Sequence, residues 1–115
     1  MMKETTKKLR SCSAHVNTRT NDWGIVSHML VSYNTPVCAL GILDGEIVND
    51  YTGEVINTCG ELFIILRSGW YDYSITTMQH VRKFLADYYG ENLTIAQLRK
   101  MALDPDTTHV IVIDW

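Results

Sequence analysis

The sequence predicts an α+β fold, with an antiparallel sheet of about four to six strands, two helices packed on one face, and the C-terminal strand in a central position. Three observations lead to this prediction. Apolar and β-branched runs fill residues 23–66, two amphipathic helical patterns lie between residues 74 and 103, and an apolar run closes the chain at residues 109–115. The length of 115 residues suits one domain.

Residues 1–22 lack apolar periodicity and are rich in Thr, Ser, Asn and Lys. They are predicted to form a flexible basic arm, with a short strand around Ala14–Val16 as the alternative, and residues 23–115 are predicted to form the single α+β domain. No apolar run reaches the roughly 20 residues that a membrane helix needs, and no hydrophobic segment follows the basic N-terminus. We therefore expect a cytoplasmic protein without a membrane partner.

The first strand is predicted at Ile25–Tyr33, which is rich in β-branched and aromatic residues. Asn34-Thr35-Pro36 is predicted to bend the chain, because proline has no backbone N–H to donate to a sheet. A second strand at Val37–Leu43 is nearly all apolar, as a strand buried on both faces would be. Asp44-Gly45 predicts a hairpin turn, because Gly45 accepts the positive φ of a type I′ turn. The remaining strands and turn are predicted at Glu46–Tyr51, Thr52-Gly53, Val55-Ile56 and Leu62–Leu66.

Two helices are predicted from their capping boxes and apolar stripes. In the first, Thr76 and Gln79 form the capping box and Gly90 provides a left-handed C-cap. In the second, Thr94 and Gln97 form the capping box, and residues 104–106 (Asp-Pro-Asp) end the helix. The apolar stripes that define them are Met78, Val81, Leu85 and Tyr88, and then Ile95, Leu98 and Met101.

The net charge of −3 is distributed unevenly along the chain. Residues 21–66 contain six acidic residues and no Lys or Arg. Such a segment repels nucleic acid and favours a basic protein partner, and Asp44 and Glu46 are its candidate binding residues. The alternative is that these acids are simply solvated in turns. The six residues are Asp22, Asp44, Glu46, Asp50, Glu54 and Glu61.

Cysteine and histidine patterns give little support for chemistry. Cys12, Cys38 and Cys59 form no CxxC pair, so neither a zinc ribbon nor a thioredoxin-type site is indicated. Cys38 is predicted to be buried in a strand, away from the helix N-terminus or base that would activate it. The four histidines form no HxH or HExxH pair, so no metal, cofactor or enzymatic activity is expected.

Two further groups of residues are candidates for binding. Trp70, Tyr71 and Tyr73 form an aromatic cluster that suits base stacking or a protein hot spot, with Arg82 supplying a positive charge, although core packing is the alternative. His80 lies in the first turn of the first helix and either contacts a ligand or bonds a nearby backbone group.

Two motifs, SYNTPV at residues 32–37 and YSITTMQHVRKFL at residues 73–85, give the chain a resemblance. It resembles short, uncharacterised proteins of bacteriophages and other mobile elements, which pair an SYNTxV strand with a YSxTTxxHxxxFL helix start. The resemblance implies an accessory role in a phage or plasmid, and it implies no catalytic residue. The matching residues are Ser32, Tyr33, Asn34, Thr35, Val37, Tyr73, Ser74, Thr76, Thr77, His80, Phe84 and Leu85.

If both motifs matter together, we expect Asn34 and Thr35 to meet the start of the helix at residues 76–80 and to satisfy its free backbone donors. The function expected is that of a small phage or mobile-element protein that binds a host protein or complex, as an anti-CRISPR inhibitor of a bacterial defence system does. A nucleic-acid-associated phage protein that uses the basic arm and the aromatic cluster is the first alternative. A small cysteine-dependent enzyme is the second.

Overall fold

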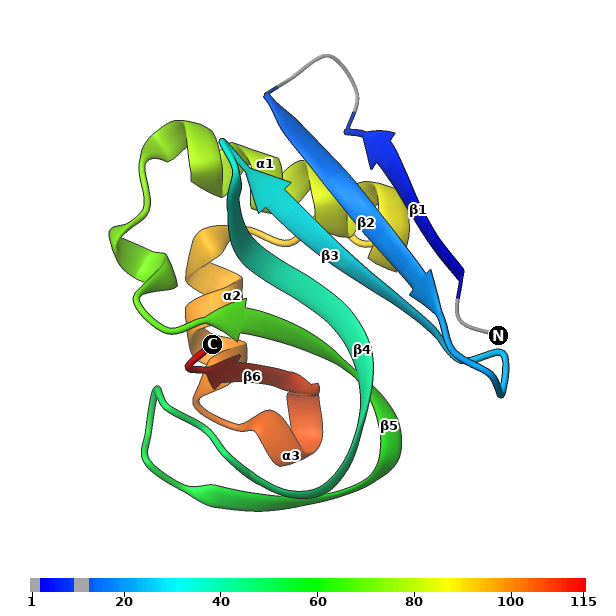
Figure 1. Ribbon diagram of the computed structural model, residues 1–115. Coiled ribbons are helices and arrows are strands. Elements are labelled where there is room, and N and C mark those ends of the chain that lie inside the picture. Colours follow the sequence, from blue (N-terminus) through cyan, green and yellow to red (C-terminus); the bar gives the residue numbers. More distant parts are fainter. Residues whose placement is uncertain (1–2, 10–12) are drawn as a thin grey trace.

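The computed structural model describes residues 3–9 and 13–115. It contains one six-stranded sheet in the order β1-β2-β3-β4-β5-β6, in which all neighbours are antiparallel except β5 and β6, which are parallel (Figure 1). The α+β class and the mostly antiparallel sheet are as predicted. The strands are β1 (Lys3–Lys8), β2 (Ala14–Thr20), β3 (Val26–Ser32), β4 (Thr35–Val48), β5 (Val55–Arg67) and β6 (Val110–Ile113). The helical elements are η1 (Trp70–Asp72), α1 (Ile75–Phe84), the π-helix η2 (Leu85–Tyr89), α2 (Ile95–Ala102) and α3 (Pro105–Thr108).

Strands β1 and β2 occupy most of the segment that was predicted to be a separate arm, and the short strand expected around Ala14–Val16 is the beginning of β2. Strand β2 pairs with β3 along its whole length, and it buries Ala14 and Val16 in the core. Strand β1 is exposed at every residue, which is why its sequence shows no apolar periodicity. Its lysines are typical of an edge strand that resists pairing with other chains.

The turn between β3 and β4 is formed by Tyr33 and Asn34, both with positive φ (49° and 67°). Thr35 and Pro36, which were predicted to belong to the bend, are instead the first residues of β4. The two-residue turn has the left-handed geometry that matches the twist of a hairpin. The register then shifts by one residue, so that Val37 is extra and both Val37 and Cys38 reach the core.

Strand β4 continues through Asp44-Gly45, where a hairpin turn was predicted. Asp44 pairs with Cys59 and Gly45 with Thr58, so the chain stays paired with β5 and no turn forms. The irregularity lies on β5, where Gly60 (φ 77°) is skipped in the register and forms a bulge. Gly45 itself has a positive φ of 115° while it stays paired in the strand, and this is why the Asp-Gly signal was misleading.

Helix α1 begins earlier than predicted, because its N-cap is Ser74 and not Thr76. The Ser74 hydroxyl accepts a hydrogen bond from the Thr77 amide at 3.2 Å. The predicted capping box at Thr76 is therefore wrong, since serine at residue 74 already satisfies the free amide. Residues 104–106, which were predicted to end the second helix, instead begin α3, with Asp104 as its N-cap and Pro105 as its first residue, and α2 has already ended at Ala102. The other two signals are confirmed. Gly90 (φ 86°) caps the π-helix, and Thr94 and Gln97 form the capping box of α2.

The C-terminal strand β6 lies at the end of the sheet and pairs with β5 alone, so the predicted central position is wrong. It is apolar because it is buried on both faces. Val110 and Val112 pack with the helices, and Ile111 packs in a second cluster with Ile56 and Phe63. The far end of the β4–β5 hairpin curls around to reach β6 (Figure 1), where the Asp50 amide donates to the Val112 carbonyl at 2.8 Å.

The helices cover one face of the sheet. A row of side chains on that face, Val16, Leu30, Cys38, Leu66 and Val112, follows the strand register and packs with Val81, Phe84, Leu85, Leu98 and Ala102 of the helical layer. Within the described residues, no helix has the length and apolar character to span a membrane.

Candidate functional site

The two motifs of the resemblance meet at the C-terminal end of β3, where Ser32 and Tyr33 make the contacts. Ser32 Oγ lies 2.7 Å from His80 Nδ1 and 3.2 Å from Thr77 Oγ1. The Tyr33 ring lies 5.5 Å from the His80 ring, centroid to centroid. The strand end and the helix start therefore meet, but through Ser32 and Tyr33. The roles expected of Asn34 and Thr35 are not seen, because both residues are exposed and the free Thr77 amide at the helix start donates to Ser74.

Ser32 matches the first motif but was not predicted to be a binding residue, although alternation along the strand gives a signal for its role. Ser32 lies two residues after the buried Leu30, so it occupies the same face of the strand. A serine in a core position needs a hydrogen-bond partner, and the helix packed on that face supplies His80 and Thr77.

The distance between Ser32 Oγ and His80 Nδ1 is that of a nucleophile paired with a general base. Both residues, however, are only 2% exposed, so a substrate has no path to the hydroxyl in this conformation. Burial lowers the pKa of His80, and the nearby Lys83 lowers it further, so the imidazole is neutral at pH 7. The arrangement holds the hairpin against the helix.

The aromatic cluster is mainly part of the core. Trp70 is 1% exposed, and Tyr73 packs against the same cluster of buried residues. Burial raises the pKa of Tyr73, and the positive charge of Arg67 opposes this effect. Only Tyr71 is exposed, and its ring contacts those of Tyr51 and Trp70. The core-packing alternative therefore accounts for Trp70 and for most of Tyr73, while the ring of Tyr71 stays accessible.

The cysteines behave as predicted where the structure describes them. Cys38 is fully buried, and burial raises the pKa of its thiol to about 12. Cys59 is exposed beside the β5 bulge, and Cys12 lies outside the described residues. Among the residues that the structure describes, no group of three or more His, Cys, Asp or Glu side chains is placed to hold a metal ion.

Asp44 and Glu46 lie on the outer face of the far half of the β4–β5 hairpin. Residues two apart on a strand share a face, so this face also carries Ile42 and Val48, and the paired positions on β5 add Leu62 and Val55. The aliphatic pairs are well exposed: Ile42 is 40% and Leu62 44% exposed, and Val48 is 49% and Val55 59% exposed. We call these six residues, Ile42, Asp44, Glu46, Val48, Val55 and Leu62, the acidic hairpin face.

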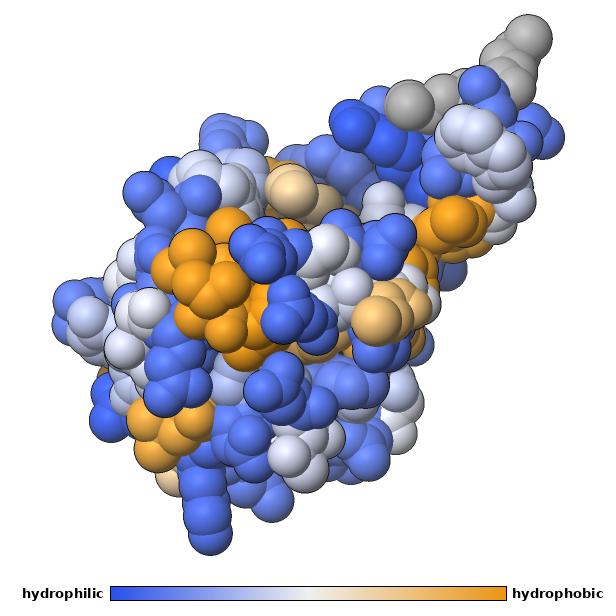
Figure 2. All heavy atoms as spheres, turned by 90° about the horizontal axis from the view of Figure 1, so that it is seen from below, coloured by the Kyte–Doolittle hydropathy of each residue, from blue (hydrophilic) through white to orange (hydrophobic). Residues whose placement is uncertain are grey.

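The inner face of the same hairpin is already filled. Leu43, Ile47, Ile56 and Phe63 point inward and pack with Ile111 of β6. The hairpin thus has one apolar face that is buried in a core and a second face, with the exposed aliphatic pairs, that lies in solvent. Figure 2, which views the molecule from this end, shows hydrophobic patches separated by hydrophilic side chains. The face therefore carries two small exposed aliphatic patches, Ile42 with Leu62 and Val48 with Val55, and the carboxylates of Asp44 and Glu46 lie between them.

A groove of about 420 Å³ lies on the sheet face that the helices leave uncovered. Its floor includes Met29, Ala39, Gly41 and Ile65, and Gly41 keeps the floor low because it has no side chain. At its rim, Arg19 pairs with Glu4 at 3.6 Å. The groove is wide and lined largely by apolar atoms.

Comparison with known proteins identifies no relative of this chain. No protein-family model, no curated protein and no solved structure matches it.

Proposed function

We propose that this chain is a small accessory protein of a phage or mobile element that acts by binding another protein through the acidic hairpin face. Its specific form is a stoichiometric inhibitor of a bacterial defence system, like an anti-CRISPR protein. The observation that supports the proposal is the acidic hairpin face, where two exposed aliphatic pairs flank two exposed carboxylates.

The composition of this face defines the partner. Its aliphatic side chains remove apolar area from water when they are covered, and the hairpin does not need that burial to fold because its inner face already has a core. Asp44 and Glu46 would be repelled by an acidic surface and attracted by a basic one. No Lys or Arg occurs between residues 20 and 66 to cancel their charge. The partner is therefore a protein with a basic, partly apolar surface.

The nucleic-acid-binding surface of a defence nuclease has this chemistry. Such a surface is rich in Lys and Arg because it neutralises phosphates. A small acidic protein that covers it blocks the target nucleic acid by occupancy, and such blocking requires no catalytic residue. Electrostatic attraction speeds the encounter, so association is expected to slow as salt concentration rises.

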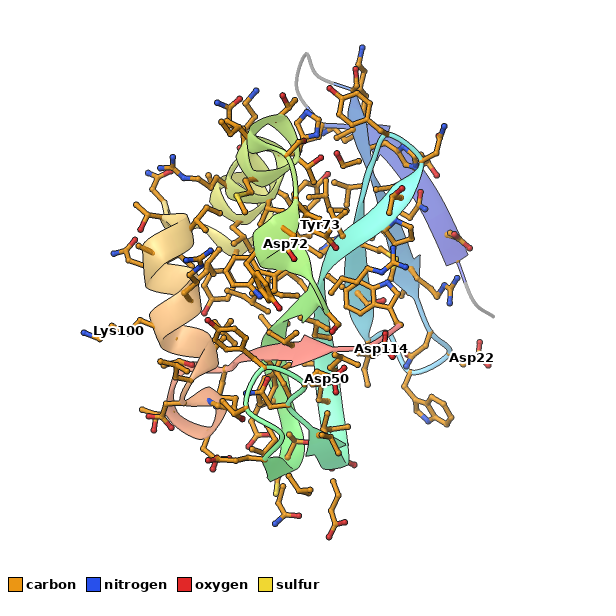
Figure 3. All side chains as sticks on the ribbon, turned by 90° about the vertical axis from the view of Figure 1, so that its left-hand side faces the viewer. Asp22, Asp50, Asp72, Tyr73, Lys100 and Asp114 are labelled. Atoms are coloured by element: carbon orange, nitrogen blue, oxygen red, sulfur yellow. The ribbon has the colours of Figure 1, made fainter. Side chains whose placement is uncertain are left out.

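The test compares three versions of the chain. In the face variant, Asp44→Lys and Glu46→Lys reverse both charges. In the control variant, Asp72→Lys and Asp114→Lys make the same change in net charge at exposed positions outside the face (Figure 3). Circular dichroism and thermal melting establish that each variant is folded.

Each chain is expressed in a bacterium whose CRISPR–Cas system restricts a targeted plasmid, and transformation efficiency is measured. We expect the wild-type chain and the control variant to restore transformation, and the face variant to fail. Each chain is then used to capture proteins from the same lysate, with identification by mass spectrometry. A partner retained equally by all three chains, or no partner above background together with no rescue of transformation, contradicts the proposal.

A further inference from the structure

The helical layer carries a second hollow, which is lined by basic side chains, in contrast to the acidic hairpin face. Gln79, Arg82, Lys83 and Ala86 line one side of it, and Asn92 lines the other, enclosing about 220 Å³. The first four residues are spaced at i, i+3, i+4 and i+7, so they form one stripe along α1 and the π-helix η2. Asn92 comes from the segment that leads into α2.

The backbone route explains why the hollow exists. The helix ends at Gly90 in a left-handed C-cap, which reverses the chain and returns residues 91–94 along the helix. The Arg82 Nε–H donates to the Leu93 carbonyl at 3.2 Å, so the returning segment is tied to the helix and the guanidinium is held in place. Ala86 is the smallest side chain of the stripe, and its size leaves the space between the two walls open.

The lining has the chemistry of an anion site. All four polar side chains are hydrogen-bond donors, and two of them, Arg82 and Lys83, are cationic. No carboxylate lines the hollow, and within residues 3–9 and 13–115 neither cation has an ion-pair partner. Asp87, the next residue along the helix, lines a different hollow together with Lys7 and Lys8.

We propose that this hollow binds a phosphate group. The guanidinium of Arg82 provides a fork that fits two phosphate oxygens, and Lys83 adds a point charge beside it. The amides of Gln79 and Asn92 donate to the remaining oxygens. Phosphate alone and the phosphate of a nucleotide share this chemistry, and the volume admits a group larger than phosphate itself. The proposal is independent of the acidic hairpin face, with which the hollow shares no residue.

The experiment follows the side-chain amide signals of Gln79 and Asn92 by NMR in phosphate-free buffer at low salt. The probes are inorganic phosphate, pyrophosphate and 5′-AMP, each titrated against wild-type protein. Two matched pairs of variants follow: Arg82→Gln with Arg99→Gln, and Ala86→Glu with Ala96→Glu. The second member of each pair makes the same chemical change on the exposed surface of α2, outside the hollow.

We expect saturable shifts of both amides with at least one probe, and at least tenfold weaker binding in Arg82→Gln and Ala86→Glu than in their partners. Because Arg82→Gln also removes the bond to Leu93, the substitution Lys83→Gln tests the charge alone, with Lys100→Gln as its control. Lys100 projects outward from α2 (Figure 3). Tighter binding of 5′-AMP than of phosphate assigns a nucleotide source, and equal binding assigns phosphate itself. The absence of saturable shifts with all three probes, or equal weakening by each variant and its control, overturns the proposal.

Discussion

Replacing Ser32 with alanine removes the hydroxyl that bonds His80 and leaves the imidazole Nδ1 buried without that partner. His80 is 2% exposed, so water cannot take the place of the serine without structural opening. Loss of one partner from a buried hydrogen bond typically costs about 1–3 kcal/mol, because the remaining group keeps its desolvation penalty. Thr77 loses a contact to the same hydroxyl, and we therefore expect a cost in the middle of this range.

The expected change in melting temperature follows from chain length. Unfolding entropy of about 2.1 cal/mol/K per residue means that each kcal/mol lowers the melting temperature of a chain of 115 residues by about 4 °C. A cost of about 2 kcal/mol, the middle of that range, is therefore expected to lower the melting temperature of Ser32→Ala by about 8 °C relative to the wild type. Urea denaturation gives the free energy itself, and a double-mutant cycle with His80→Phe gives the coupling energy, which is expected to exceed about 0.5 kcal/mol.

The same junction predicts a pH dependence. The pKa of His80 is lowered in the folded protein, so below about pH 6.5 the unfolded chain binds a proton that the folded chain resists. The stabilisation is complete above pH 6.5 and is lost as the pH falls below it, with a slope of at most about 1.4 kcal/mol per pH unit. His28, whose pKa is also lowered by burial, contributes with the same sign, so the measured quantity is the difference between wild type and His80→Phe. A Ser32→Ala protein as stable as the wild type, with no coupling to His80, would refute the reasoning.

Three other properties follow from single residues. In a Cys12→Ser background, Cys59 is expected to react with a thiol reagent in the folded protein and Cys38 only on unfolding, since its pKa is raised to about 12; rapid labelling of both under native conditions would contradict this. Asn34→Ala is expected to lose about 1 kcal/mol in urea denaturation because its φ is 67°, whereas Asn34→Gly is not, and equal stability of the two would count against the turn. Thr94→Ala, which removes one half of a capping box, is expected to cost about 1 kcal/mol by the same measurement, and a neutral effect would show that the cap is dispensable.

Signals that depend on local chemistry were predicted from the sequence. Gly90 and the box at Thr94 and Gln97 act within one turn of backbone, so their residues alone determine what they do. Cys38 was placed in the core because its neighbours are apolar, and burial needs only that pattern. The core-packing alternative accounts for Trp70 and Tyr73, but the apolar pattern alone does not tell which ring of the aromatic cluster stays exposed, and this is Tyr71.

Features that depend on distant partners were missed. Strand β1 is polar on both faces, and only its pairing with β2 reveals it as a strand. The long apolar C-terminal run was predicted to be a central strand because it is buried on both faces. An edge strand has the same apolar pattern when the helices cover one of its faces and the curled β4–β5 hairpin covers the other, as happens at β6. At Asp44-Gly45 the deciding fact lies across the ladder, where Gly60 takes up the irregularity as a bulge. In each of these three cases the structure of the segment depends on residues that are distant in the sequence, so the segment's own residues do not predict it.

The junction at Ser32 stabilises the turn between β3 and β4. Tyr33 and Asn34 hold the turn in a left-handed conformation that costs free energy for non-glycine residues, and the contacts of Ser32 and Tyr33 with His80 offset that cost. These contacts favour one register of β3, because a slip of one residue would carry Ser32 from the core face to the other side of the sheet. Beyond the turn, the register is adjusted twice, by the extra residue Val37 on β4 and by Gly60 on β5. Which side chains reach the surface at the far end of the hairpin, Asp44 among them, therefore depends on these two bulges and not on the junction alone.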